Sequence, residues 1–454
     1  MKSPLDRRFW LLAIAIAGVC IGVRRLPAPH SVAANEQREA GSGSAVQFVG
    51  AGSCSASACH NANFARGATG SEFTTWMARD RHAKAHETLF DERSARIQKN
   101  RQTATPAQDD RRCLGCHVAP EFGSASPSAP AYFKTDGVSC ESCHGPAKRW
   151  LPIHHLDAWQ RKSPARKKQL GMNDTQSLVG RAQVCVACHV GAPGMEVDHD
   201  LIAAGHPRLH FEFAAYHGAM PGHWSAGKDY ARVNRARADG RDAQRGQAEF
   251  EARAWLVGQL VTAHAALELL ADRAGDQKKT WPEFADFDCA ACHHDLWPSR
   301  PKSKSAQRGR KPGSLSWGHH VALTPMSLDA LRAPARAEVR TVLAELQKIM
   351  DAGPARRIPA AKHATQAAAM LRAAIARLDG RTIRDASLEV AFLQLVAEQT
   401  TRHDGPYDER MQIHLGLEPL RRALGNGPRA PTTGLSVREF DPLTLRRRLE
   451  LPRK

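Results

Sequence analysis

One short motif constrains this chain more than any other feature, because five copies of it consume almost all of the cysteines. The motif places two cysteines three positions apart, with a histidine directly after the second. Ten of the eleven cysteines lie in such motifs, and every copy ends in histidine. In chain order the copies are residues 54–60, 113–117, 140–144, 185–189 and 289–293, and the first has four residues between its cysteines instead of two.

This spacing is typical of c-type haem attachment, in which two thiols bond to the vinyl groups of haem and the adjacent imidazole binds the iron. Zinc knuckles, redox dithiols and disulfides also use paired cysteines, but none of them requires a histidine after every pair. We therefore predict five covalently attached haems c. The predicted attachment residues are Cys54, Cys59, Cys113, Cys116, Cys140, Cys143, Cys185, Cys188, Cys289 and Cys292. The predicted proximal iron ligands are His60, His117, His144, His189 and His293.

The N-terminus carries an export signal, which a protein with covalent haem requires. Residues 1–25 begin with basic side chains and continue with an apolar run from Phe9 to Val23. Such a segment is either a signal peptide, cut here near residues 31–33, or a retained membrane anchor. Cys20, the remaining cysteine, lies inside the apolar run, and we interpret it as a passive apolar residue. The bulk of the chain is expected in the periplasm, anchored to the inner membrane if the segment is retained.

Composition divides the rest of the chain into four parts. Residues 26–47 are rich in Ala, Ser, Gly and Pro and are predicted to form a flexible linker. The haem motifs place a pentahaem domain at residues 48–325. Helical spacing of apolar residues then predicts a helical bundle over residues 326–425, followed by a basic tail at 426–454.

The periodicity predicts helices and almost no strands. Residues 244–272 carry one long apolar stripe, and four later segments with helical spacing each end near a glycine. Those segments are residues 335–352, 360–379, 382–402 and 407–424. The expected fold is therefore mostly α, with extensive loops organised around covalent haems, little or no β structure, and a C-terminal helical bundle.

The chain is strongly basic, with a formal net charge of +18. Five haems would add about ten propionate charges, so the loaded protein stays basic. A basic surface favours acidic redox partners, and anionic lipid headgroups if the N-terminus associates with a membrane. No nucleic-acid motif is present, and the basic runs are typical of solvated loops and tails.

Several stretches resemble the cytochrome c-554 family of multihaem cytochromes, over roughly residues 48–325. They are TWMARDRHAKAHETL (75–89), GVSCESCHGPAKRWLPIHH (137–155), VDHDLIAAGHPRLHFEF (197–213), MPGHW (220–224) and CAACHHDL (289–296). The resemblance implies a mostly helical fold, closely stacked haems and iron held between two histidines. It implies that the distal ligands are His82, His154, His199, His206 and His223. The family is tetrahaem and one of its haems can be five-coordinate, so two histidines on all five irons is a prediction for this chain alone.

The residues themselves limit some of these choices. His82 and His86 are one helical turn apart, so both could face haems. His154 and His155 cannot point the same way. Pro207 disfavours helix at His206, which is expected to approach from a loop. Five further histidines are reserve candidates for distal ligands, with a surface or propionate-bonded histidine as the alternative for each: His210, His217, His294, His319 and His320.

Two functions from different classes fit these features. The first is an electron carrier that moves charge between redox partners through closely spaced haems. The alternative is a multihaem reductase or oxidase of a small nitrogen or sulfur compound, which requires one iron with an open coordination position. In either case the C-terminal bundle either docks the protein into a larger assembly or only stabilises the fold.

Overall fold

The computed structural model describes residues 48–62, 69–118, 132–224, 243–287, 319–352, 356–378, 388–395 and 407–424. The chain divides into two units, Met1–Val46 and Gln47–Lys454, and all described residues belong to the second. The expected signal or anchor, the linker, the basic tail and the fifth motif with Cys289, Cys292 and His293 lie outside the described residues. His294 lies outside them as well.

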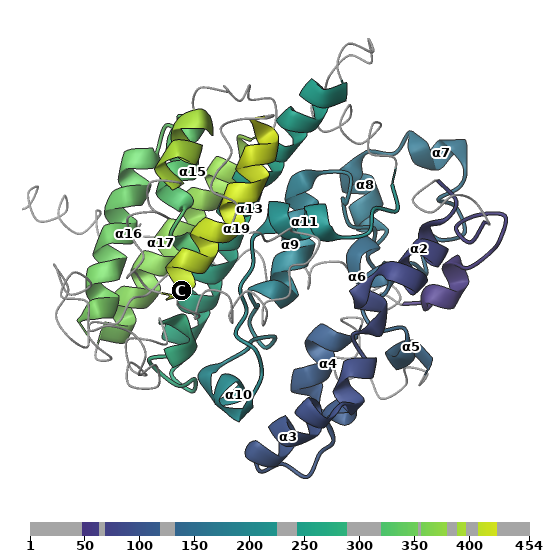
Figure 1. The fold of residues 1–454 in the computed structure, drawn as a ribbon, viewed down its shortest axis with the longest axis horizontal. Helices are drawn as coiled ribbons and strands as arrows, with labels where there is room; N and C mark the ends of the chain where they lie inside the picture. The colour runs from purple at the N-terminus through teal and green to yellow at the C-terminus, as the bar shows by residue number, and fades with distance from the viewer. Residues whose placement is uncertain are drawn as a thin grey trace, which may run out of the picture. The chain divides into compact units, whose positions relative to one another are not determined.

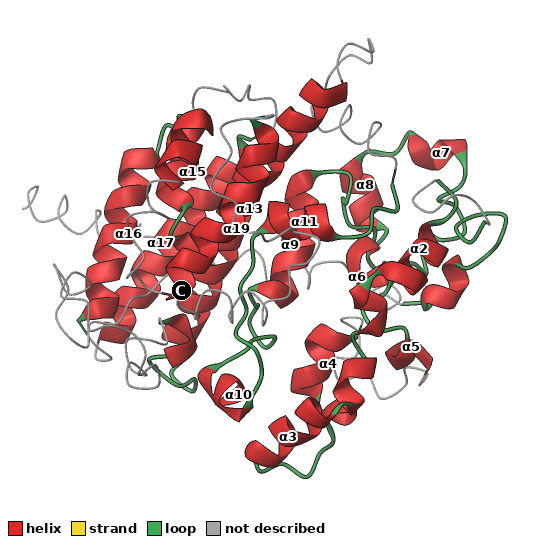
Figure 2. Ribbon diagram, in the orientation of Figure 1, coloured by secondary structure: helices red, strands yellow, loops and turns green. Residues whose placement is uncertain are grey.

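The part of the chain that holds the first four motifs consists of short helices joined by loops (Figure 1). Its elements are η1 (Ala51–Cys54), α2 (Glu72–Arg79), η2 (Arg81–Lys84), η3 (Glu87–Phe90), α3 (Glu92–Asn100), η4 (Ala107–Asp109), α4 (Arg111–His117), α5 (Tyr132–Thr135), α6 (Cys140–His144), α7 (Asp157–Gln160), α8 (Pro164–Gln169), α9 (Leu178–His189), α10 (His199–Ala204) and α11 (Phe213–Ala219). Only an isolated bridge, between Ala192 and Met195, has β character in the described residues (Figure 2). The expected mostly-α fold is confirmed.

Longer helices follow and gather around α13, as Figure 1 shows. The elements are α13 (Ala243–Gly275), η6 (Phe284–Asp286), η8 (His319–Val321), α15 (Thr324–Ala330), α16 (Arg336–Asp351), α17 (Arg357–Ala376) and α19 (Tyr407–Ala423), and residues 388–395 are also helical. α13 packs against α17, α19, α15, α11 and α9, and α16 packs against α17.

One hydrophobic core joins these helices. Its fully buried side chains include Leu260 of α13, Leu346 of α16 and Leu371 of α17. The same core includes Val186 of α9 and Phe213 of α11, so it draws on residues from both sides of the boundary expected near residue 325. That boundary stays a prediction. The helix that carries the fourth motif is anchored directly in this core.

Among the described residues one helix, Gly246–Gly275, is long and apolar enough to cross a membrane. However, 72% of its most apolar stretch is buried inside the protein. Packing in the hydrophobic core therefore accounts for the apolar character of this helix.

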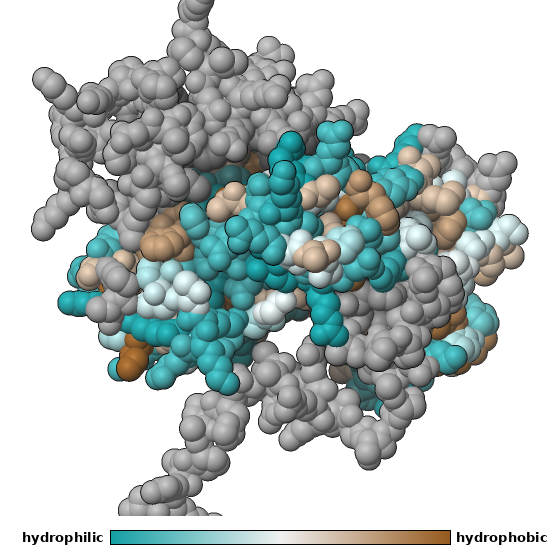
Figure 3. Space-filling model, turned by 90° about the horizontal axis from the view of Figure 1, so that it is seen from below, coloured by the Kyte–Doolittle hydropathy of each residue, from teal (hydrophilic) through white to brown (hydrophobic). Residues whose placement is uncertain are grey.

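The described surface is mostly polar. On the face seen in Figure 3, hydrophobic residues are scattered among hydrophilic ones. Large apolar side chains that are exposed include Phe90, at 63%, and Ile358, at 80%. Single exposed apolar residues of this kind are normal on a protein surface and do not define a docking site.

Candidate haem-binding sites

Short capped helices position three of the four described motifs. The second, third and fourth motifs lie at the C-terminal ends of α4, α6 and α9, and the motif histidine is the last helical residue each time. The Asp110 and Ser177 side chains accept hydrogen bonds from the first turns of α4 and α9, and Ser139 with Ser142 forms a capping box on α6. Such caps fix where each helix begins, and hence where its cysteines lie.

The first motif is held differently. Its first cysteine, Cys54, ends η1, whereas Cys59 and His60 lie in the turn that follows. The two carboxylate oxygens of Glu141, a residue inside the third motif, accept hydrogen bonds from the backbone N–H groups of Val49, Gly50 and Ala147 at 2.6–3.1 Å. Glu141 is only 2% exposed. This buried carboxylate therefore ties the segment before the first motif to the helix of the third.

Thiols of different motifs lie next to one another. The Cys54 thiol lies within reach of Cys140, and this contact lowers the pKa of Cys54. The Cys116 thiol is placed in the same way beside Cys188, and that contact lowers the pKa of Cys116. All eight described motif cysteines are free thiols. The structure thus brings the first motif to the third and the second motif to the fourth.

Three motif histidines each face a histidine that the sequence singled out as a distal ligand. The ring centroids of His60 and His154 are 6.1 Å apart, those of His82 and His189 are 6.0 Å apart, and those of His144 and His223 are 6.4 Å apart. The members of each pair are far apart in the sequence, and chain folding alone brings them together.

Of the remaining predicted ligands, His206 lies near the second motif, and His199 contacts the described segment that precedes the fifth. The pKa of His206 is lowered by burial and also by the neighbouring His117 imidazole. α10 ends at Ala204, so His206 lies in the loop beyond it. His199 begins α10; its backbone N–H donates to Glu283 at 2.8 Å, and its ring lies 5.8 Å from that of Phe284. Glu283 and Phe284 are six and five residues before Cys289, the first cysteine of the fifth motif.

For six of these imidazoles the Nδ1 atom has an oxygen partner, and the partners are of two kinds. Nδ1 of His60 lies 3.1 Å from Glu72 Oε2, and Nδ1 of His82 lies 2.9 Å from Asp80 Oδ1. Four more have neutral oxygens: the Ala85 carbonyl for His117, the Thr175 hydroxyl for His144, the Leu151 carbonyl for His154 and the Pro207 carbonyl for His206. In each case Nδ1 is occupied, which leaves Nε2 for a metal.

Burial keeps the central imidazoles neutral. It lowers the pKa of His144 to about 4, and His223 adds to this effect. It lowers the pKa of His189 to about 4 as well, with a smaller contribution from His82. A neutral imidazole has the free lone pair that iron ligation requires.

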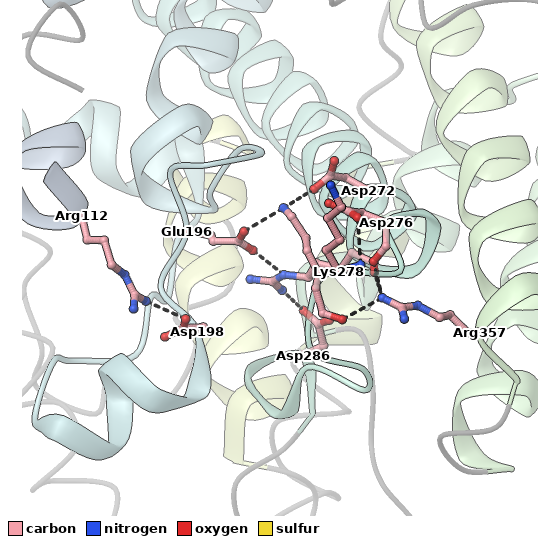
Figure 4. A network of polar contacts seen from close by, with 10 residues as sticks. Arg112, Glu196, Asp198, Asp272, Asp276, Lys278, Asp286 and Arg357 are labelled. Atoms are coloured by element: carbon pink, nitrogen blue, oxygen red, sulfur yellow. Dashed lines mark hydrogen bonds and ion pairs between the residues drawn. The ribbon is translucent and has the colours of Figure 1, made fainter. Parts of the chain in front are cut away.

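The region before the fifth motif is fixed by an ion-pair network (Figure 4). The Arg273 guanidinium, on α13, donates to Glu196 at 2.5 Å and to Asp286 at 2.6 Å. Lys279 pairs with the same Glu196 at 3.1 Å and with Asp272. Glu196 is three residues before His199, and Asp286 is three residues before Cys289. One guanidinium therefore joins the segment of a predicted distal histidine to the segment that leads into the last motif.

Three of the reserve histidines gather in a separate buried cluster. His210 Nε2 lies 2.6 Å from Asp408 Oδ1, and Arg208 contacts both Asp408 and His319, at 3.1 and 3.2 Å. The rings of His319 and His320 lie 3.9 Å apart. These contacts tie α19 to the loop after α10, and they give the His210 ring a carboxylate partner.

Comparison with known proteins bears on the N-terminal part of this arrangement. A family model described as cytochrome c554 and c-prime matches residues 53–145. The chain resembles the cytochrome c-554 family. A cytochrome c-554 from Nitrosomonas europaea is 31% identical over 124 residues, which are 25% of this chain and 50% of that protein. The chain thus spans about half the length of the curated relative it matches, and no solved structure matches it. This resemblance supports a c-type cytochrome, a class that carries covalently bound haem c.

The geometry of the described residues fits haem. Two imidazoles that bind one iron from opposite sides have ring centroids about 6 Å apart, because each metal–nitrogen bond is about 2 Å long. The three facing pairs have this separation although no bond joins them. The sequence alone did not identify four residues that contact the motifs or the expected ligands: Glu72, Asp80, Glu141 and Arg273. Their only signal in the sequence is a charged side chain close to a motif or an expected ligand.

Proposed function

We propose that the protein is a periplasmic pentahaem electron carrier whose irons are held between two histidines. The three histidine pairs with centroid separations of 6.0–6.4 Å are the observation that supports this most strongly. On this basis His154 is the distal ligand of the first haem, His223 of the third and His82 of the fourth. His206 is assigned to the second haem because it neighbours His117. His199 is assigned to the fifth because it contacts Glu283 and Phe284, shortly before the fifth motif in the sequence.

Haem supplies an iron that alternates between the ferric and ferrous states. The protein's part is to hold that iron with the same ligands in both states, so that little has to move when an electron arrives. An iron held between two of these histidines would have no open position for a substrate, which favours a carrier over the alternative enzyme.

The neighbouring thiols support rapid transfer between haems. Each motif thiol would bond to the edge of one porphyrin, so neighbouring thiols of two motifs would bring two porphyrin edges close together. Cys54 with Cys140 links the first and third haems, and Cys116 with Cys188 links the second and fourth. The Cys143 thiol is close enough to raise the pKa of Cys185, after burial, and so connects the two pairs. The resulting order of haems is first, third, fourth, second.

The surface charge supports acidic partners. The polypeptide carries +18 and has a pI of about 9.7, and a basic surface attracts acidic proteins over distances of about a Debye length, roughly 8 Å at physiological salt. We propose acidic redox proteins as both donor and acceptor. Docking should therefore weaken as the salt concentration rises.

Replacing His154 by Ala is expected to convert one of five low-spin ferric haems to high spin, because the first iron loses its distal imidazole. Electron paramagnetic resonance of the oxidised, exported protein measures this directly. His155→Ala is the matched control, since the two rings are adjacent, with centroids 5.9 Å apart, and only His154 faces His60. Conversion by His155→Ala but not by His154→Ala would refute the assignment. A high-spin haem in the unmodified protein that responds to nitrite, hydroxylamine or cyanide would favour the enzyme.

A further inference from the structure

We infer that Glu72 and Asp80 hold the first and fourth haems at lower reduction potentials than the second and third. The inference rests on the ligation proposed above. It starts from the two carboxylates that accept hydrogen bonds from iron-binding imidazoles: Glu72 from His60, at 3.1 Å, and Asp80 from His82, at 2.9 Å. His60 lies on the proximal side of the first haem, and His82 on the distal side of the fourth.

The chemistry follows from the charge of the acceptor. When Nε2 binds iron, Nδ1 carries the hydrogen, and a carboxylate that accepts this hydrogen increases the basicity of the imidazole. A more basic ligand, together with a nearby negative charge, stabilises ferric iron relative to ferrous iron. Reduction adds one electron to the iron and moves no proton in this scheme. Its potential therefore falls.

Both carboxylates are fixed in place by the backbone. Glu72 accepts hydrogen bonds from the Gly70 N–H at 2.9 Å, and Asp80 accepts one from the His82 N–H at 3.0 Å, as the N-cap of η2. Backbone packing holds His82 as well: a Cβ on Gly137, whose φ is +60°, would lie 2.7 Å from the His82 carbonyl oxygen. The two hydrogen bonds are thus built into the fold.

The second and third haems lack such a contact among the described residues. His117 donates to the Ala85 carbonyl, and His144 to the Thr175 hydroxyl, which are neutral acceptors. Arg181 also lies near the third haem, where its charge lowers the pKa of both His144 and His223, as a minor contribution beside burial. A neighbouring cation favours ferrous iron and raises the potential.

The same two carboxylates also act through space on the third haem, where they reduce the difference between the haems. Asp80 and Glu72 each affect His223 more than Arg181 does, but neither carboxylate is hydrogen bonded to its imidazole, and the inference rests on such hydrogen bonds. Asp80 is the more buried acid, with 8% of its side chain exposed against 22% for Glu72. Because charges interact more strongly away from water, the fourth haem should be affected more than the first.

A consequence concerns where electrons reside. The close pairs of haems are the first with the third and the second with the fourth. In each pair, one haem has an iron-binding imidazole that is hydrogen bonded to a carboxylate, and the other haem has none among the described residues. Electrons would therefore collect on the third and second haems, and the first and fourth would act as low-potential steps. The third haem, which lies between the first and the fourth in the proposed order, would hold an electron within the protein.

The test is a potentiometric titration of the full-length exported protein, followed by the haem absorption bands. Asp80→Asn should move one of the lowest one-electron steps to higher potential, and Glu72→Gln should move a different low step by less. The double variant should move both. Asn remains a good N-cap, so Asp80→Asn removes the charge while keeping the local helix.

Glu87→Gln is the control, because it removes the same charge from the same segment. Glu87 is 63% exposed, pairs with Lys84 and has no hydrogen bond to a ligand imidazole. The inference is overturned if neither Asp80→Asn nor Glu72→Gln moves any single step further than Glu87→Gln does. Paramagnetic resonance of the same samples distinguishes a failure of this inference from a failure of the proposed ligation. If the haems are low-spin but the reduction steps do not move, only this inference is refuted. If low-spin haems are absent, the proposed two-histidine ligation is refuted.

Discussion

A variant with serine at both Cys140 and Cys143 is expected to carry one covalent haem fewer than the unmodified protein, and to lose electron exchange between the two halves of the haem array. The third motif is central: Cys140 touches Cys54 of the first motif, and Cys143 is near Cys185 of the fourth. Without the third haem, His223 has no iron to bind. Intact-mass measurement gives the haem count, and stopped-flow reduction shows whether one group of haems now reduces separately.

Cys20→Ser provides the control for that experiment, since Cys20 is the one cysteine outside the motifs. It should leave the haem count unchanged. If Cys140→Ser with Cys143→Ser also leaves the count unchanged, the third motif does not attach haem. If the haem is lost but the remaining haems still reduce as one group, the proposed order of haems is wrong.

Replacing Arg273 by Met is expected to lower the free energy of unfolding by about 3 kcal/mol, because it leaves two carboxylates without their shared cation. Arg273 is 4% exposed and bonds Glu196 and Asp286 at once. Burial raises the pKa of Asp286 to about 6 even with Arg273 beside it. Denaturant unfolding followed by circular dichroism measures the change. The effect should also loosen the fifth haem, since both carboxylates lead into segments assigned to it.

Arg372→Met, on the neighbouring helix α17, is the matched control. Arg372 pairs with Glu268 of α13, but its side chain is 52% exposed. Exposed ion pairs contribute about 1 kcal/mol or less. Equal losses for the two variants would mean that the Arg273 network is an ordinary surface feature and does not fix the approach to the fifth motif.

The local features of this protein were predictable from the sequence, because they depend on neighbouring residues. The apolar stripe at 244–272 corresponds to α13, and the segments expected at 335–352 and 407–424 correspond to α16 and α19. The cysteine motifs are local as well. Their spacing is set by the two bonds and the iron ligand that one haem requires.

The pairing of histidines was not predictable in the same way. His60 and His154, or His82 and His189, meet only after the intervening chain has folded, and no local periodicity encodes such contacts. The resemblance to a known family supplied the candidates but not their partners. The contacts of Asp80 and Glu72 with imidazoles were not predictable for a related reason. An acidic residue near the start of a helix is usually a cap or a solvated charge, and only the fold places it against an imidazole.

The most direct test of covalent haem at the motifs is the intact mass of full-length protein exported in a host that attaches haem, measured under denaturing conditions. The account predicts the polypeptide mass plus five haems, with all ten motif thiols resistant to alkylation. A mass equal to the polypeptide with disulfides between neighbouring thiols, such as Cys54 with Cys140, would contradict it.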